Sequence, residues 1–445
     1  MAFVTNPMPR AVQFWIALCS LLLVSFKPII DFFWETKLKL GHLAVNLQGF
    51  AALILLGLTI LLLIMHRTSL ISKKIPTWAQ FLFWVLSVLA IYHILVVPRS
   101  LEWTLKYWTA ASGLLFIPWA SSVLLERASY DPKPYYWISK SIGISLSLVF
   151  IGMLLQLFGL KDWATLDTFQ NLGNVGRLTS FYYHPLDLVR VLIWVAALLT
   201  ILLLAPSKNQ TRSQAILLWS SFFFLNFLLL RTTHRTTLIF CLFLPLILGL
   251  LNKKIPKGIL MTFVVILSWN VWGFLPSGRG FSVGIFELNH FIDFGTTAPD
   301  SSQIGSPSTG VAPIKKEFEF EFGRGRSKIW HEHWEWMKTF TPLEWALGAR
   351  EEWPRDSQFL QTHNQVIDLV ETFGLVGLFV LGSLLTLTLI SSSASLSFKV
   401  PIALVYFFYA MISQPLVSPT FVWWSLVFLT FPSWKTAPAD WGCKS

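Results

Sequence analysis

Long apolar runs recur along almost the whole of this chain, and they constrain its fold more than any other feature. A run of roughly 17–25 apolar residues crosses the ~30 Å hydrocarbon core of a bilayer as an α-helix. About twelve runs lie near residues 11–31, 46–65, 78–97, 107–125, 136–158, 186–205, 214–230, 236–251, 257–274, 366–390, 400–416 and 418–433. Because backbone groups in lipid must be hydrogen-bonded internally, each run is expected to be helical. The pattern predicts an all-α polytopic membrane protein with about 12 transmembrane helices.

The composition agrees with this class of fold. Only 13% of the residues are charged, about half the share found in soluble domains. The net charge of +11 also suits a nucleic-acid partner, but much of it lies in short loops, where Lys and Arg set membrane orientation. We therefore expect membrane lipids, and no nucleic acid, as partners. Cys19, Cys241 and Cys443 are too few and too scattered for a disulfide framework or a metal cluster.

The runs divide the chain into three parts. Residues 1–274 hold the first nine predicted helices, 275–365 form one large loop, and 366–445 hold the last three helices and a short tail. The second, fourth, sixth and eighth loops carry more Lys and Arg than the short odd-numbered ones. The positive-inside rule therefore places both termini in the cytoplasm and the large loop on the outer side of the membrane.

The large loop contains two patterns of its own. Charged and aromatic residues alternate strictly from Glu317 to Phe322, which predicts a short strand or an interfacial ribbon. Between Ser327 and Phe340, apolar and aromatic residues recur at helical spacing. This second pattern predicts an amphipathic helix that lies on the membrane surface.

A polar pair, His363-Asn364, ends the large loop and begins the tenth run. An imidazole with an ordinary pKa of about 6.5 at the water–lipid boundary suits a proton acceptor. Gly374 and Gly377 lie further along the same predicted helix, where they allow close helix packing. Glu371 lies about two turns below His363, and a carboxylate inside a membrane indicates function. The alternative interpretation is an interfacial histidine followed by glycines that serve packing only.

Two arginines, Arg231 and Arg235, lie in the short loop between the seventh and eighth runs. The planar guanidinium group matches phosphate oxygens with paired hydrogen bonds, so these residues are candidates for a phosphate clamp. The alternative is that they extend to lipid phosphates, as boundary arginines commonly do.

Three further residues are candidates for the same side of the membrane. Arg326 precedes Ser327, a potential N-cap of the predicted surface helix, and helix N-termini favour anions. Arg190 lies inside the sixth run, where a charge is costly without a function. His184 precedes that run as a second polar group of the site or as a residue at a helix start. The His331-Glu332-His333 segment lacks the spacing of a zinc motif, so no metal site is predicted.

These motifs together resemble the O-antigen ligase and polymerase superfamily of bacterial envelope glycosyltransferases. The family pattern is His, then Asn, Ser or Gln, nine residues, Gly, two residues, and Gly, Thr or Tyr. His363, Asn364, Gly374 and Gly377 match it at every specified position, at the end of a large loop as in the family.

Three upstream segments are also similar to elements of this family. Residues 326–330 resemble its Gly-Arg-x-x-x-Trp element, and 235–238 resemble its Ser-Arg-Thr-x-Leu element, with His234 replacing the usual small residue. Residues 183–185 are similar to its Gly-x-x-x-His-Pro-Asn element, although Leu186 replaces the Asn.

The resemblance implies a GT-C-like enzyme of the bacterial inner membrane whose active site and large loop face the periplasm. It implies inverting, metal-independent transfer of an undecaprenyl-diphosphate-linked glycan, without a cofactor, to a hydroxyl of lipid A–core. His363 would be the catalytic base. The diphosphate would be bound by Arg235 and Arg326, assisted by Arg190 or Arg231. The supporting residues would be Asn364, His184, Gly374 and Gly377.

Other functions compatible with the same motifs differ in acceptor or in class. A polymerase would transfer to another lipid-linked repeat unit, and a protein O-oligosaccharyltransferase would transfer to a protein. A transporter for the same lipid-linked substrate is a separate class, but no inverted repeat or pair of broken helices supports it. A purely structural membrane scaffold leaves the intramembrane arginines unexplained.

Overall fold

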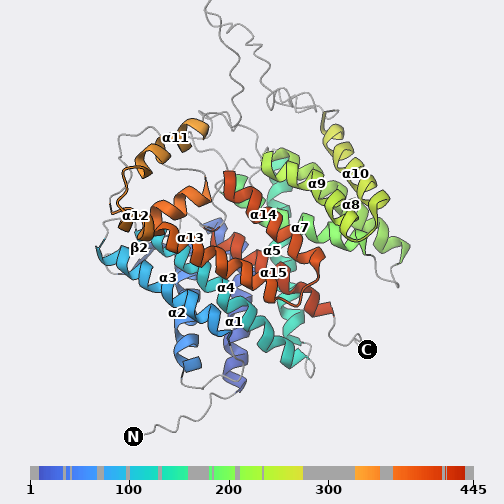
Figure 1. Cartoon of the computed structure of the whole chain (residues 1–445). Helices are drawn as coiled ribbons and strands as arrows, with labels where there is room; N and C mark the ends of the chain where they lie inside the picture. The colour runs from blue at the N-terminus through green and yellow to red at the C-terminus, as the bar shows by residue number, and fades with distance from the viewer. Residues whose placement is uncertain are drawn as a thin grey trace, which may run out of the picture.

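The computed structural model describes residues 10–33, 37–40, 43–67, 75–96, 101–128, 133–158, 180–182, 185–205, 211–232, 235–273, 326–350, 364–412, 416 and 418–435. These residues form a bundle of helices (Figure 1). The long apolar helices are α1 (Arg10–Ile30), α2 (Leu47–Arg67), α3 (Thr77–Val96), α4 (Leu101–Ala128), α5 (Lys133–Leu157), α7 (Pro185–Leu204), α8 (Arg212–Arg231) and α13 (Gln365–Ser391). The shorter ones are α9 (Arg235–Leu251), α10 (Ile255–Gly273), α14 (Leu396–Ile412) and α15 (Pro419–Lys435).

The prediction of a helical membrane protein is confirmed. Within the described ranges, eight helices are long and apolar enough to cross a membrane. Each of the twelve apolar runs in the sequence coincides with one of the helices named above. Four of these helices, α9, α10, α14 and α15, fall below the length of a full span over their apolar stretch. Twelve crossings therefore remain a prediction.

Helix α4 lies at the centre of one part of the bundle. It packs against α1, α2, α3 and α15, and 78% of its apolar window is buried inside the protein. Helices α7, α8, α9 and α10 pack against one another as a second group, seen in green and yellow in Figure 1. Helix α15 joins the two groups because it contacts both α4 and α7.

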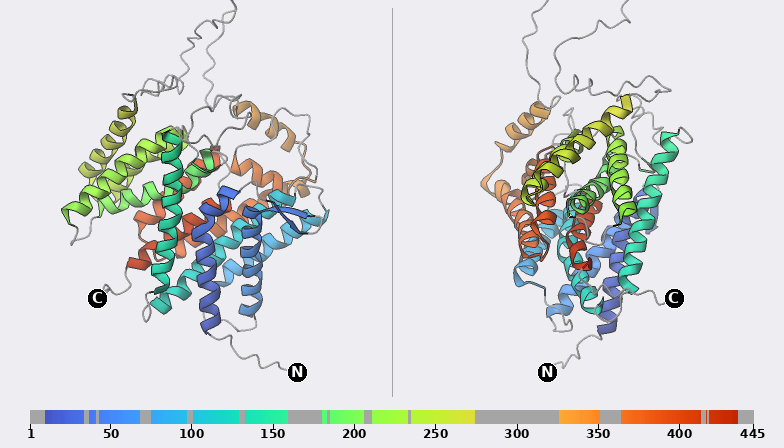
Figure 2. Two further views of the ribbon diagram at one scale, coloured as in Figure 1. Left: turned by 180° about the vertical axis from the view of Figure 1, so that it is seen from behind. Right: turned by 90° about the vertical axis from the view of Figure 1, so that its right-hand side faces the viewer.

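A short β-hairpin follows α1 and was not predicted from the sequence. After the turn η1 (Asp31–Phe33), strands β1 (Lys37–Leu40) and β2 (Leu43–Asn46) pair antiparallel, with Lys37 opposite Asn46. The hairpin lies beside the beginning of α2 (Figure 2, left). The strand predicted at 317–322 lies outside the described residues.

The helix predicted in the large loop is present as α11 (Arg326–Met337). Its buried residues, Ile329, His333 and Met337, recur every fourth position and so share one face. This helix packs against α13 and lies on the side of the bundle opposite the N-terminus (Figure 1). A second short helix, α12 (Pro342–Leu347), follows and packs against the same helix. The position of α11 on the membrane surface remains a prediction.

Candidate functional site

Asn364 begins α13 as its N-cap. Its side-chain Oδ1 accepts hydrogen bonds from the backbone N–H groups of Val366 (2.9 Å) and Ile367 (3.3 Å). These are two of the amides that a helix start otherwise leaves without a partner. The predicted supporting residue Asn364 therefore has a clear local role: it sets where α13 starts. The predicted base, His363, lies outside the described residues.

The first turn of α13 is attached to α4 through Tyr107. Gln365 Nε2 donates to the Tyr107 hydroxyl at 2.6 Å, and that hydroxyl donates to the Asp368 carboxylate. Gln365 Oε1 also accepts the backbone N–H of Leu416 at 2.8 Å, which connects the same turn to the segment before α15. This network was not predicted from the sequence. Its signal there is the presence of two polar residues, Gln365 and Asp368, at the start of an apolar run.

Glu371, two turns into α13, is hydrogen-bonded to His333 of α11. The distance between His333 Nδ1 and Glu371 Oε1 is 2.6 Å, and the two side chains are only 2% and 6% exposed. Glu371 was predicted to be a functional carboxylate inside the membrane, whereas the hydrogen bond between His333 and Glu371 was not predicted from the sequence. Among the described residues, no three His, Cys, Asp or Glu side chains form a group that could hold a metal ion.

Gly374 breaks α13, although the sequence placed it within a regular helix. Its φ of 66° and ψ of −170° are not helical. A Cβ at this position would lie 2.2 Å from the carbonyl oxygen of Ala346, so only glycine leaves room for α12. Beyond the break, Gly377 leaves space for the Phe373 side chain, since an added Cβ would lie 2.1 Å from Phe373 Cβ. Both motif glycines therefore serve close packing around a break in the helix.

Arg190 of α7 forms an ion pair with Asp187 one turn earlier. Its Nη1 lies 2.5 Å from Asp187 Oδ1, and both side chains are partly exposed. The Arg190 charge also lies within electrostatic range of the Tyr409 hydroxyl on α14. Tyr409 is in turn hydrogen-bonded to Thr237, in the first turn of α9. Helices α7, α9 and α14 therefore meet near Arg190, which the sequence predicted to assist in binding the donor diphosphate.

A buried ion pair between Lys27 and Asp31 lies at the end of α1. Thr420 of α15 accepts from Lys27 Nζ at 3.2 Å and donates to the Asp31 carboxylate. Lys27 Nζ also lies 5.9 Å from the ring centroid of Trp423. This ion pair was not predicted from the sequence, although a Lys and an Asp four residues apart in an apolar run are the signal for such a pair.

The Lys27–Asp31 ion pair lies near the Arg190–Asp187 ion pair, because the carboxylates of Asp31 and Asp187 both act electrostatically on the Tyr182 hydroxyl. Burial, followed by the negative charges of Asp31 and Asp187, raises the pKa of the Tyr182 hydroxyl well above its ordinary value. This hydroxyl is buried and has no hydrogen-bond partner among the described residues. The Tyr182 ring packs against Phe32, with 5.0 Å between ring centroids. Two acidic residues from different helices therefore lie around one neutral phenol.

For three of the remaining predicted site residues the structure describes the backbone only, and a fourth lies outside the described residues. Arg231 is the last residue of α8, Arg235 the first of α9, and Arg326 the first of α11. The side chains of these three arginines, like the whole of His184, lie outside what the structure describes. Their assembly with Arg190 and Asn364 into one site is therefore still a prediction.

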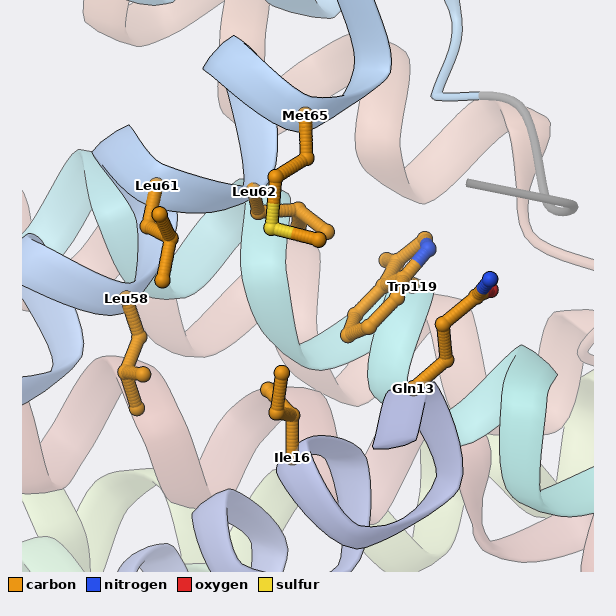
Figure 3. Close-up of a pocket in the computed structure, with 7 residues that line it drawn as sticks. All are labelled: Gln13, Ile16, Leu58, Leu61, Leu62, Met65 and Trp119. Atoms are coloured by element: carbon orange, nitrogen blue, oxygen red, sulfur yellow. The ribbon is translucent and has the colours of Figure 1, made fainter. Parts of the chain in front are cut away.

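An apolar hollow lies at the other end of the bundle, near the N-terminus. It is lined by Gln13, Ile16, Leu58, Leu61, Leu62, Met65 and Trp119, from α1, α2 and α4 (Figure 3). Gln13 is the one polar residue of this lining, so the hollow has no group suited to an anionic substrate. None of the predicted site residues contributes to it.

Comparison with known proteins does not assign the chain to a family. No protein-family model, no curated protein and no solved structure matches it. The likeness to O-antigen ligases thus rests on the motif residues themselves.

Proposed function

We propose that this chain is an inverting glycosyltransferase of the O-antigen ligase type. In this proposal it transfers a glycan from undecaprenyl diphosphate to a hydroxyl of lipid A–core at the periplasmic side of the inner membrane. The chain crosses the membrane about twelve times, with α9, α10, α14 and α15 as shorter or tilted spans.

The observation that carries the proposal is the beginning of α13. The motif from His363 to Gly377 matches the family pattern, and two of its positions have structural roles that suit their residue types. Asn364 caps the helix, and Gly374 opens the break against which α12 packs. The positive φ and the close backbone contact at Gly374 require glycine at a position that the family pattern also specifies as Gly.

Buried polar groups among the described residues support the same proposal. Lys27, Asp31, His333 and Glu371 are buried within the bundle, and Arg190 lies near the start of α7. Charged groups are costly within a membrane and commonly mark substrate sites. A carrier-lipid diphosphate needs such a site at the membrane boundary, because its lipid chain stays in the bilayer and its charge lies at the interface.

The proposed reaction transfers the glycan in one displacement. The acceptor oxygen attacks the anomeric carbon, its proton passes to His363, and the bond from that carbon to the phosphate oxygen breaks. The leaving diphosphate gains negative charge, which Arg235 and Arg326 neutralise, with assistance from Arg190 or Arg231. The bond to Asp187 occupies one of the five N–H donors of the Arg190 guanidinium group. The attack from the opposite face inverts the anomeric carbon.

Reconstitution of the purified protein with defined lipids tests the proposal. The expected result is transfer from an undecaprenyl-diphosphate-linked glycan to lipid A–core, and loss of transfer in His363→Ala at an unchanged protein level. Arg235→Glu is expected to weaken donor binding. Arg212→Glu is the matched control. Arg212 is exposed and begins α8, whereas Arg235 follows the other end of that helix. Full transfer by His363→Ala would overturn the base assignment.

A deletion strain separates a ligase from a polymerase of the same superfamily. Loss of a ligase leaves long glycan chains on the carrier lipid and bare core. Loss of a polymerase leaves core that bears a single repeat unit. The proposal expects the first outcome, and the second would reassign the acceptor.

A further inference from the structure

We propose that His333 and Glu371 are positioning residues that hold the loop helix α11 on α13 in one register. The pair would thereby fix the helix that begins at Arg326 relative to the helix that begins after Asn364. This inference rests on the proposed function, because it concerns the two halves of the same site.

The buried face of α11 makes this pair specific. Ile329 and Met337 lie one turn before and one turn after His333, and all three are buried. The two apolar residues alone would tolerate sliding along α13, because apolar contacts are not directional. A histidine between them must find a polar partner, since burying an imidazole without a hydrogen bond is costly. Glu371 supplies that partner at 2.6 Å, and the bond forms in one register only.

Glu371 also receives the other end of the loop segment. Its backbone carbonyl accepts the N–H of Ala349 at 2.9 Å. In an uninterrupted helix this carbonyl would bond to the amide four residues later, Leu375. The break at Gly374 lies between them and directs the chain so that the segment after α12 can bind. Residues 326–350 are therefore attached to Glu371 twice, through His333 and through Ala349.

His333 and Glu371 lie the same number of residues after Arg326 and Asn364, which begin the two halves of the proposed site. His333 follows Arg326 by seven residues, and Glu371 follows Asn364 by seven residues. Seven helical residues rise about 10.5 Å. A slip of α11 by one turn would displace Arg326 by about 5.4 Å, which is enough to remove a guanidinium group from a phosphate. The pair therefore acts on the donor side without touching the reacting atoms.

A covalent substitute for the pair tests positioning directly. In a background with Cys19, Cys241 and Cys443 replaced by Ala, His333→Cys and Glu371→Cys are made singly and together. Each single variant is expected to raise the donor KM about 10-fold, with little change in the acceptor KM. Bridging the double variant with a short bifunctional methanethiosulfonate is expected to restore the donor KM to within about 3-fold of the parent. Reduction of the bridge should remove the rescue.

Three outcomes decide the question. Rescue by the bridge supports positioning. A bridged double variant that stays folded but inactive overturns it, because the pair would then perform chemistry that a tether cannot replace. A parental donor KM in both single variants overturns it as well. His331→Cys is the matched control on the same helix, since the His331 side chain is 72% exposed and lies on a different face of α11 from His333. The kinetics of this variant should be unchanged.

Hydrogen exchange of the α11 amides provides a readout that needs no enzymatic activity. Glu371→Leu is expected to lower protection across Ile329 to Met337, whereas Glu371→Gln, which keeps a hydrogen-bonding side chain, should lower it less. Unchanged protection in Glu371→Leu overturns the inference whatever the protein catalyses. Failure of the wild-type protein to transfer a glycan would overturn the proposed function alone. The docking of α11 by this pair would still stand if Glu371→Leu lowers the exchange protection of α11.

Discussion

Gly348 and Gly374 each lie against the backbone just before the other glycine, where α12 meets α13. A Cβ on Gly374 would lie 2.2 Å from the carbonyl oxygen of Ala346, and a Cβ on Gly348 would lie 2.3 Å from that of Thr372. Both glycines have positive φ, 97° at Gly348 and 66° at Gly374. His93 Nε2 donates to the neighbouring Leu347 carbonyl at 2.6 Å. The segment that contains α12 is thus attached to α3 and α13 through direct backbone contact and this hydrogen bond.

Replacing Gly374 with Ala should displace α12 and reduce transfer. A positive φ with ψ near 180° alone costs a non-glycine residue about 1–3 kcal/mol, and the Cβ adds a clash with backbone that cannot rotate away. The expected result is a lower Tm of the purified protein in detergent, together with loss of transfer. Gly382→Ala is the matched control, because a Cβ there meets nothing within 4 Å. Equal Tm values for the two variants would show that the break in α13 is not needed.

Replacing Tyr107 with Phe should loosen the start of α13. The change removes the hydroxyl that donates to Asp368 and accepts from Gln365, at an expected cost of about 1–3 kcal/mol in unfolding free energy. Because this turn directly follows His363, the rate of transfer should fall as well. Tyr136→Phe on α5 removes an exposed hydroxyl and serves as the control. Identical stability and activity of the two variants would contradict a role for the network.

The Lys27–Asp31 pair should behave as a unit in a double-mutant cycle. Lys27→Met leaves the Asp31 carboxylate buried without its cation, which is expected to destabilise the protein by about 3–5 kcal/mol. Lys27→Met combined with Asp31→Leu should recover most of that loss, because both charges are then gone. The measurement is thermal unfolding of the four proteins. Additive effects of the single changes would mean that the two side chains do not interact.

The capping box of α12 predicts a pH dependence of local stability. The Thr341 backbone N–H, followed by its hydroxyl, donates to the Glu344 carboxylate and lowers the pKa of that group. A lowered pKa in the folded state means that the stabilisation is present above the ordinary pKa of about 4.3 and is lost as the pH falls below it. Exchange protection of α12, corrected for intrinsic rates, should therefore fall between about pH 5 and pH 3. In Thr341→Ala, the exchange protection of α12 should be weaker at neutral pH and should change less with pH. The same pH profile in this variant as in the wild-type protein would show that the capping box does not stabilise α12.

The sequence by itself determined the class of fold and the positions of the helices. Each apolar run became a helix, as expected for apolar segments whose backbone groups must bond internally in lipid. The helix in the large loop was also predictable, since spacing within a few residues defines an amphipathic face. Asn364 likewise lies where its residue type favours a cap. These are all local properties, readable from neighbouring residues.

Only the tertiary structure decided which polar groups meet. His333 and Glu371 are 38 residues apart, Tyr107 and Asp368 are 261 apart, and Lys27 and Thr420 are 393 apart. Gly374 leaves the helical conformation because α12 arrives against it, and the sequence around it reads as ordinary helix. A helix start or an apolar face is set by residues within one or two turns. A buried pair is set by how whole helices pack, since a side chain must be neutralised by whichever partner the packing brings within reach.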